Sequence, residues 1–340
     1  MAKKIIFRAD GNSQTGLGHL YRIFALVEVF RNEFDYIIIT KASSVTEVIP
    51  EGYSYTVIPD SVEIDKEPKW ISDNYSSDEY FIIADGYQFD DIYQKNITEE
   101  GYYLVYIDDL VSKNISANLI INHSLNIDSN DYQSNEYTKF ALGPKYAILR
   151  PGFIKEARKK RKIDSIDTIF VSFGGADFYD LTNRCLEGII NLKNIKKIHV
   201  VLGSAYKHSE IYDTIKGAEK KVFLHSNISE NQMIDLMKQC QLAIVPSSTI
   251  SYEVCSVKMI ILSGYYVDNQ MNIYNGLKSN GLIYSAGDFN LYSPEMFKQK
   301  VQNILADNQD NYQKKIDSKS HLFDGMQNER ILSLIIAEYE

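Results

Sequence analysis

"KKIIFRADGNSQTGLGHLYRIFALVEVF", residues 3–30, is the stretch that decides the fold class. It opens with a short β-branched and aromatic run, continues through a glycine-containing loop, and ends in apolar residues at helical spacing. This order is typical of a βαβ unit, whose strands lie in a buried parallel sheet. We therefore expect a strand that ends near Asp10 and a helix that begins near His19.

The same alternation continues along the chain in two series, separated by a break. Strand-like runs lie at 36–40, 80–84, 102–107 and 118–122, and then at 168–173, 197–202, 222–225, 242–246, 259–263 and 282–286. The basic stretch "KEARKKRK", 155–162, lies between the two series and carries no strand signal.

These series predict an α/β protein with two Rossmann-like domains, because domains average roughly 150 residues and the chain has 340. The predicted boundaries are 1–150 for the first domain, 151–164 for a linker, 165–326 for the second domain, and 327–340 for a closing helix. We expect the active site in the crevice between the two domains.

Composition and charge exclude several classes of protein. Hydrophobic residues make up 44% and charged residues 24%, as in soluble globular proteins, and the net charge of -9 argues against binding to a nucleic acid backbone. No apolar run is long enough for a membrane span or a signal peptide, so we expect a cytoplasmic protein, favoured to be a monomer. The three cysteines are widely spaced and predict buried, reduced thiols.

Polar residues follow nearly every predicted strand of the first domain. Because ligands of open parallel sheets bind beyond the carboxyl ends of the strands, these residues are candidates for a site. They are Asp10, Asp85, Tyr87, Asp108, Asp109, Asn122 and His123.

The loop that contains Gly16, Gly18 and His19 is the most informative of these strand ends. Both glycines allow the backbone to approach a ligand closely, although they also suit a tight turn. The positive end of the following helix disfavours the imidazolium form of His19, which favours a neutral base there. The alternative is that His19 only caps the helix, and His123 is then the second candidate base.

In the second domain, Gly174, Gly175 and Ala176 form a turn between a strand and a helix, where backbone amides could cradle a diphosphate. The spacing is not G-x-G-x-x-G and no acidic residue closes the next strand, so we do not expect NAD.

A second hydroxyl-rich turn holds Ser247, Ser248 and Thr249, with Glu253 one helical turn further on. The hydroxyls either cap the helix or contact phosphate, and Glu253 either accepts hydrogen bonds from ribose hydroxyls or faces solvent. Asn269 and Gln270 follow a later strand, so their amides either reach sugar hydroxyls or cap the next helix.

Together these residues resemble the family of UDP-2,4-diacetamido-2,4,6-trideoxy-β-L-altropyranose hydrolases of the pseudaminic acid pathway, which is related to the lipid II-forming N-acetylglucosaminyltransferase. The likeness covers nearly the whole chain. It rests on the G-x-G-H-x-x-R loop at 16–22, "SFGG" at 172–175, "LGPKYAILRPGF" at 142–153, "SSTISYE" at 247–253 and "DNQ" at 268–270. The chain departs from the family pattern at "ADFYDLT", 176–182, and at Ser247 and Ser248, where glycines are usual.

The resemblance implies a glycosyltransferase-B-like fold and hydrolysis of the anomeric C–O bond of a UDP-sugar, without a metal or another cofactor. His19 would be the base for water. The residues expected at the sugar are Asp10, Gly16, Gly18, Arg22, Asp85, Tyr87, Asn269 and Gln270. The residues expected at UDP are Gly174, Gly175, Ala176, Ser248, Thr249 and Glu253. A glycosyltransferase that uses the same donor, or a binder of sugar nucleotides without activity, are the alternatives.

Overall fold

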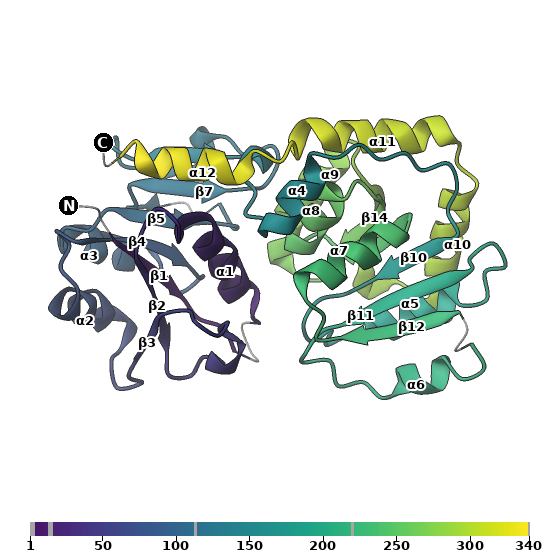
Figure 1. Cartoon of the computed structure of the whole chain (residues 1–340), viewed down its shortest axis with the longest axis horizontal. Coiled ribbons are helices and arrows are strands. Elements are labelled where there is room, and N and C mark those ends of the chain that lie inside the picture. Colours follow the sequence, from purple (N-terminus) through teal and green to yellow (C-terminus); the bar gives the residue numbers. More distant parts are fainter. Residues whose placement is uncertain (1–3, 13–15, 112–113, 219–220, 339–340) are drawn as a thin grey trace. The chain divides into compact units, whose positions relative to one another are not determined.

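The computed structural model describes residues 4–12, 16–111, 114–218 and 221–338, and it contains two compact units (Figure 1). Unit 1 comprises Met1–Pro151 and Met326–Glu340, and unit 2 comprises Gly152–Gly325. Each unit is built on its own parallel sheet with helices on both faces, so the predicted α/β class is confirmed.

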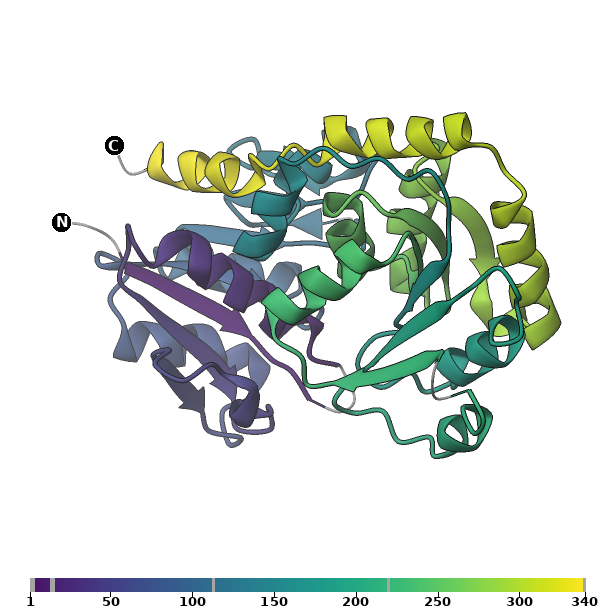
Figure 2. The same ribbon diagram turned by 45° about the vertical axis from the view of Figure 1, so that its right-hand side comes forward.

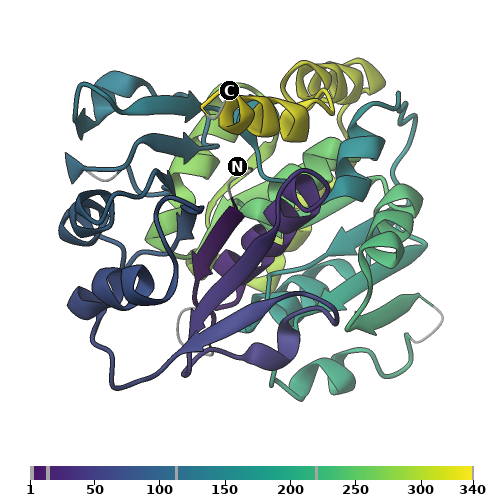
Figure 3. The same cartoon turned by 60° about the vertical axis from the view of Figure 1, so that its left-hand side comes forward.

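The sheet of unit 1 has the strand order β3-β2-β1-β4-β5-β7-β9, and all neighbouring strands are parallel (Figure 3). Its strands are β1 (Lys4–Ala9), β2 (Tyr36–Lys41), β3 (Tyr55–Ile58), β4 (Tyr80–Asp85), β5 (Leu104–Ile107), β7 (Leu119–Asn122) and β9 (Lys139–Leu142). A small separate pair is formed by β6 (Asn114–Ile115) and β8 (Gln133–Ser134). The chain order reverses between β1 and β4, which is the point where Rossmann-type sheets bind ligands.

Helices cover both faces of this sheet because each presents an apolar stripe to it. They are α1 (Gly18–Phe30), α2 (Glu67–Asn74), α3 (Asp91–Glu99) and α12 (Gln327–Ile336). Leu20 and Ile23 of α1 share one core with Ile331 of α12, whereas Ile71 of α2 and Ile97 of α3 belong to the core on the other face.

The sheet of unit 2 has the order β12-β11-β10-β13-β14-β15 and is also parallel throughout (Figure 2). Its strands are β10 (Thr168–Val171), β11 (Lys197–Leu202), β12 (Val222–Ser226), β13 (Leu242–Pro246), β14 (Ile260–Tyr265) and β15 (Tyr284–Asp288). Its helices are α4 (Pro151–Ala157), α5 (Leu181–Ile189), α6 (Glu210–Thr214), α7 (Glu230–Gln239), α8 (Thr249–Ser256), α9 (Met271–Ser279), α10 (Pro294–Leu305) and α11 (Gln309–Leu322).

The stretch 151–164 is not the linker that the sequence predicts. Helix α4 forms there, and Phe153 is completely buried in unit 2. The basic residues that follow are also anchored, because Arg161 donates hydrogen bonds to the carbonyl groups of Met237, Cys240 and Val257. The charge run hid a short helix whose apolar residues lie on one face.

The last helix also has a definite place. Ile331 and Ile335 of α12 are buried in the core of unit 1, with 1% and 0% of their surface exposed. Unit 1 is therefore built from two segments of the chain that are separated in sequence by the whole of unit 2.

Cys185, Cys240 and Cys255 are all buried and form no disulfide, as predicted. Across the described ranges, every helix is too short or too polar to cross a bilayer.

Candidate functional site

The polar strand ends of unit 1 meet next to the reversal point of its sheet. Strand β4 ends in Asp85, and α1 follows the glycine loop after β1. His19, the second residue of α1, places its Nδ1 atom 2.7 Å from Asp85 Oδ1. The two candidates that the sequence placed on different strand ends thus form one buried pair.

The contact with Asp85 favours one tautomer of His19. Both oxygens of Asp85 accept hydrogen bonds from Arg22, and the 2.7 Å contact of Asp85 with His19 favours the tautomer of His19 that carries its proton on Nδ1. No described residue hydrogen-bonds to the Nε2 atom of His19, and 9% of the side chain is exposed. The ring therefore offers its lone pair on Nε2, which is the arrangement of an oriented general base.

Arg22 lies one helical turn beyond His19 and donates hydrogen bonds to two carboxylates. Its Nε and Nη2 atoms donate to Asp85 at 2.8 and 2.6 Å, and its Nη1 atom lies 2.7 and 2.6 Å from the two oxygens of Asp109. Burial alone would lower the pKa of Arg22, but Asp109 and Asp85 raise it well above its usual value. We expected Arg22 and Asp85 to contact sugar. The geometry instead favours a role in positioning His19, because the side chains of Arg22 and Asp85 are hydrogen-bonded to each other.

Asp109 extends the cluster to His123 and Tyr87. Burial raises the pKa of Asp109, but the Arg22 guanidinium outweighs it and the net pKa lies below the usual value. His123 Nε2 lies 3.6 Å from Asp109 Oδ1, and burial lowers the pKa of His123 to about 4. The Tyr87 hydroxyl donates to Asp109 at 3.4 Å, and its ring packs edge-on against His19 with centroids 4.7 Å apart.

His123 differs from His19 in its access to solvent, since only 1% of its surface is exposed. A base has to reach a water molecule, so His19 is the better candidate of the two.

Asp10 belongs to a second charged cluster in unit 1. Arg8 lies between Asp10 and Glu67 and donates to both, and Lys41 also pairs with Glu67. Asp10 in addition accepts a hydrogen bond from Gln88. The side chain of Asp10 is 16% exposed, so part of it remains accessible to a ligand.

The two glycines of the His19 loop, Gly16 and Gly18, differ in why the position favours a glycine. Gly16 has a φ of +79°, which disfavours any residue with a Cβ atom. At Gly18 the φ is not positive and a Cβ atom would meet no described atom within 4 Å. The described protein atoms therefore give no reason why this position must be a glycine, whereas the close approach of a ligand would give one.

In unit 2 the turn after β10 has the predicted backbone freedom. Gly174 has a φ of +88°, and at Gly175 a Cβ atom would meet no atom of the described residues within 4 Å. A Cβ atom at Gly203, however, would lie 2.4 Å from the carbonyl oxygen of Gly174 and 2.1 Å from that of Gly175. The loop after β11 therefore supports this turn through direct backbone contact.

Asp177 has a structural function that no sequence motif predicted. Its carboxylate accepts hydrogen bonds from the backbone N–H groups of Leu181 and Thr182, so it caps α5. These amides are therefore not available to a phosphate. An acidic residue shortly before an apolar helix start is the signal that could have indicated this cap.

Helix α8 begins differently. Ser248 precedes it and makes no capping hydrogen bond with its side chain, and Ser251 hydrogen-bonds back to Ser248. Thr249 begins the helix, and Glu253 is buried, with 7% of its surface exposed. Between the two predicted anion sites, α8 is the helix whose first turn lacks an internal carboxylate cap.

The remaining predicted residues lie beyond β14. The Gln270 side chain is buried, and its Oε1 atom accepts a hydrogen bond from the backbone of Tyr266 at 3.0 Å. Asn269 lies beside it in the short 3₁₀ turn Asp268–Gln270 and is half-buried. Gln270 thus shapes the turn.

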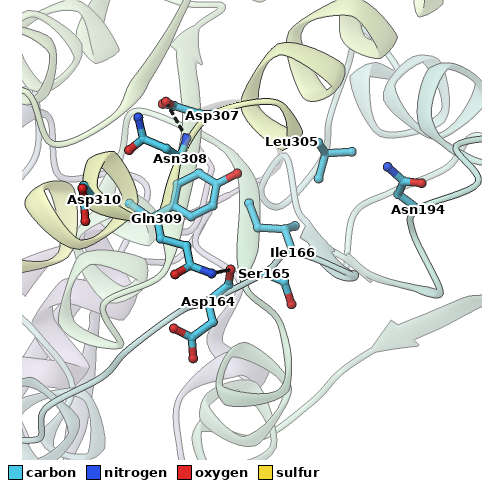
Figure 4. A pocket seen from close by; sticks show the side chains of 10 residues that line it. Asp164, Ser165, Ile166, Asn194, Leu305, Asp307, Asn308, Gln309 and Asp310 are labelled. Atoms are coloured by element: carbon cyan, nitrogen blue, oxygen red, sulfur yellow. Dashed lines mark hydrogen bonds between the residues drawn. The ribbon is translucent and has the colours of Figure 1, made fainter.

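A cavity of about 640 Å³ lies elsewhere in unit 2 (Figure 4). It is lined by residues that precede strands, such as Ile166 before β10 and Asn194 before β11, and by Asp307 and Gln309 between α10 and α11. It therefore lies at the amino-terminal edge of the sheet. The predicted site residues of unit 2 lie at the opposite edge.

Proteins of similar sequence point to a family. The UDP-2,4-diacetamido-2,4,6-trideoxy-β-L-altropyranose hydrolase of Campylobacter jejuni is 25% identical over 289 residues, which are 82% of this chain and 97% of that protein. The resemblance to this hydrolase family is confirmed. An uncharacterised protein of Methanocaldococcus jannaschii is 26% identical to the present chain, and the match covers 80% of this chain. The chain spans only 57% of the length of that archaeal protein.

Solved structures show the fold. The MurG structure from Acinetobacter baumannii matches with a TM-score of 0.65 at 11% identity. The match covers 98% of the present chain and 99% of the MurG chain. The predicted glycosyltransferase-B fold is thereby confirmed. No family model matches the chain.

Proposed function

We propose that the chain hydrolyses a UDP-linked diacetamido-trideoxyhexose to the free sugar and UDP, as a step of nonulosonic acid biosynthesis. The substrate class is UDP-2,4-diacetamido-2,4,6-trideoxy-β-L-altropyranose or a close relative. The similarity to the Campylobacter hydrolase supports this class, and the buried pair of His19 and Asp85 is the observation that carries the chemistry.

In this proposal His19 is the general base. Its Nε2 atom takes a proton from a water molecule while the water oxygen bonds to the anomeric carbon of the sugar. The bond between that carbon and the phosphate oxygen breaks, and its electron pair leaves with UDP. Asp85 accepts the Nδ1 proton as a hydrogen bond throughout, so it stabilises the imidazolium that forms.

Unit 2 supplies the nucleotide site. Among the described residues, no carboxylate caps the first turn of α8, and the positive end of a helix stabilises the charge on a leaving diphosphate. Gly175 would allow the backbone to approach the same group, and the buried carboxylate of Glu253 would accept hydrogen bonds from the ribose hydroxyls. These assignments need no metal ion for the leaving group.

A glycosyltransferase is the second candidate, because the MurG-like fold would serve equally if an acceptor hydroxyl replaced water. The distinction is whether UDP forms without any acceptor. A binder of sugar nucleotides would release no UDP in either case.

The deciding experiment incubates the purified chain with a panel of UDP-sugars in ¹⁸O-labelled water and analyses the products by mass spectrometry. The proposal expects UDP together with free sugar that carries the label at its anomeric carbon. Label in UDP would mean attack at phosphorus and would contradict the mechanism. Release of UDP only after a carbohydrate acceptor is added would establish the transferase instead.

A further inference from the structure

Two loops of unit 2 are tied together at the carboxyl edge of its sheet. In the loop after β10, Asp180 accepts a hydrogen bond from the hydroxyl of Tyr206 in the loop after β11, at 2.6 Å. The Nε2 atom of His208 lies 2.9 Å from the carbonyl oxygen of Asp177. These side chains hold the two loops in a fixed relation.

The same contacts bring three potential metal ligands together. One ligand atom each from Asp180, His208 and Glu210 lies within 4.8 Å of the other two. We propose that these residues bind a divalent transition metal ion of the Zn²⁺ class. One imidazole with two carboxylates is a ligand set that such ions accept, and it leaves a fourth position for water.

The hydrogen bonds around the cluster leave a possible ligand atom on both Asp180 and His208. A carbonyl oxygen only accepts, so His208 carries its proton on Nε2 and keeps a lone pair on Nδ1. The hydroxyl of Tyr206 occupies Oδ1 of Asp180, so Oδ2 remains for a ligand. An imidazole that donates its second N–H group to a backbone carbonyl is the usual arrangement at protein metal sites.

The distances require only a small closure. Ligand atoms around a tetrahedral ion at about 2.0–2.1 Å lie roughly 3.4 Å apart. Glu210 is exposed at the start of α6, so its side chain can move inward, whereas Asp180 and His208 are partly buried and already held. Binding would therefore fasten the β11–α6 loop to the loop that contains Gly174 and Gly175.

The cysteines would not compete for the ion. All three are buried, and burial raises the pKa of Cys240 and of Cys255 to about 12, so their thiolates do not form at neutral pH.

The test is calorimetric titration of the metal-free full chain with Zn²⁺ at pH 7.5. The proposal expects one equivalent to bind, and it expects His208→Gln and Glu210→Gln each to weaken that binding at least tenfold. Mg²⁺ should not compete, because it disfavours imidazole ligands.

Matched controls are His321→Gln and Glu295→Gln, which change the same residue types on other helices of unit 2 and should leave binding unchanged. Equal weakening by the controls, or one-equivalent binding that survives His208→Gln, would overturn the site, as would no binding at all. Hydrolysis of UDP-sugar is measured separately, so the failure of either proposal is visible without the other.

Discussion

His19 and His123 show how the surroundings of a residue decide its chemistry. Both lie within reach of carboxylates in unit 1. His19 keeps part of its ring exposed and has its Nδ1 proton fixed by Asp85, whereas His123 is enclosed and its pKa falls to about 4 because of burial. The ring of His19 is therefore accessible to solvent, whereas His123 is held neutral inside the protein.

The role of His19 predicts that binding and turnover separate in a variant. His19→Asn keeps a polar side chain of moderate size but removes the base, so turnover should fall by roughly 10²–10⁴-fold while UDP affinity stays near the wild-type value. The measurement is UDP release together with calorimetric titration of UDP. A variant that turns over within threefold of wild type would leave His19 as a helix-start residue only.

His123 predicts a pH dependence of stability. The unfolded chain takes a proton on this residue near pH 6.5, but the folded chain does so only at about pH 4, so the unfolded state binds more protons between these values. Unit 1 should therefore lose about 3 kcal/mol of stability as the pH falls from 6.5 to 4.

The single tryptophan, Trp70 in α2, allows this to be measured in unit 1 alone. Urea unfolding is followed by Trp70 fluorescence at several pH values, for wild type and for His123→Asn. The variant should lack most of the slope in this pH window, whatever its absolute stability. The same slope in both proteins would assign the effect to other groups.

At the scale of elements, the loops that follow β10 and β11 should respond differently to the same substitution. Gly175→Ala meets no described atom within 4 Å, so the fold should be unchanged, but the added methyl group lies at the proposed diphosphate turn and should weaken UDP binding about tenfold or more. Gly203→Ala would collide with two backbone oxygens and should lower thermal stability as well. Thermal melts and UDP titrations of both variants check this, and unchanged UDP affinity in Gly175→Ala would remove this turn from the site.

Strands and helices were easier to predict from the sequence than the contacts between side chains of different elements. The alternation of apolar runs was sufficient for the parallel sheets, because each run is buried on both faces and is marked by its own composition. The pairing of His19 with Asp85, and of Arg22 with Asp109, depends on which strands become neighbours, and no local pattern contains that information. Helix α4 was not predicted, because the basic run at 155–162 made residues 151–164 resemble a solvent-exposed linker.

At the scale of the whole molecule, α12 predicts a consequence of shortening the chain. A chain that ends at Gly325 lacks Ile331 and Ile335, which are buried in the core of unit 1. Burying an isoleucine contributes about 1.5–3 kcal/mol, so unit 1 should lose roughly 3–6 kcal/mol. Trp70 fluorescence in urea measures this loss, and a chain that ends at Ile336 is the control that keeps the helix. An unchanged midpoint for the shorter chain would show that α12 does not stabilise unit 1.

The divided construction of unit 1 also sets the order of events during synthesis. A ribosome delivers the first 151 residues, then all of unit 2, and only afterwards the helix that completes the first core. Until α12 has been synthesised, the apolar face formed by α1 and its sheet remains exposed, although unit 2 can already fold by itself. The nascent chain thus exposes this face for as long as translation of the intervening 174 residues lasts, and this interval is when chaperones would find it.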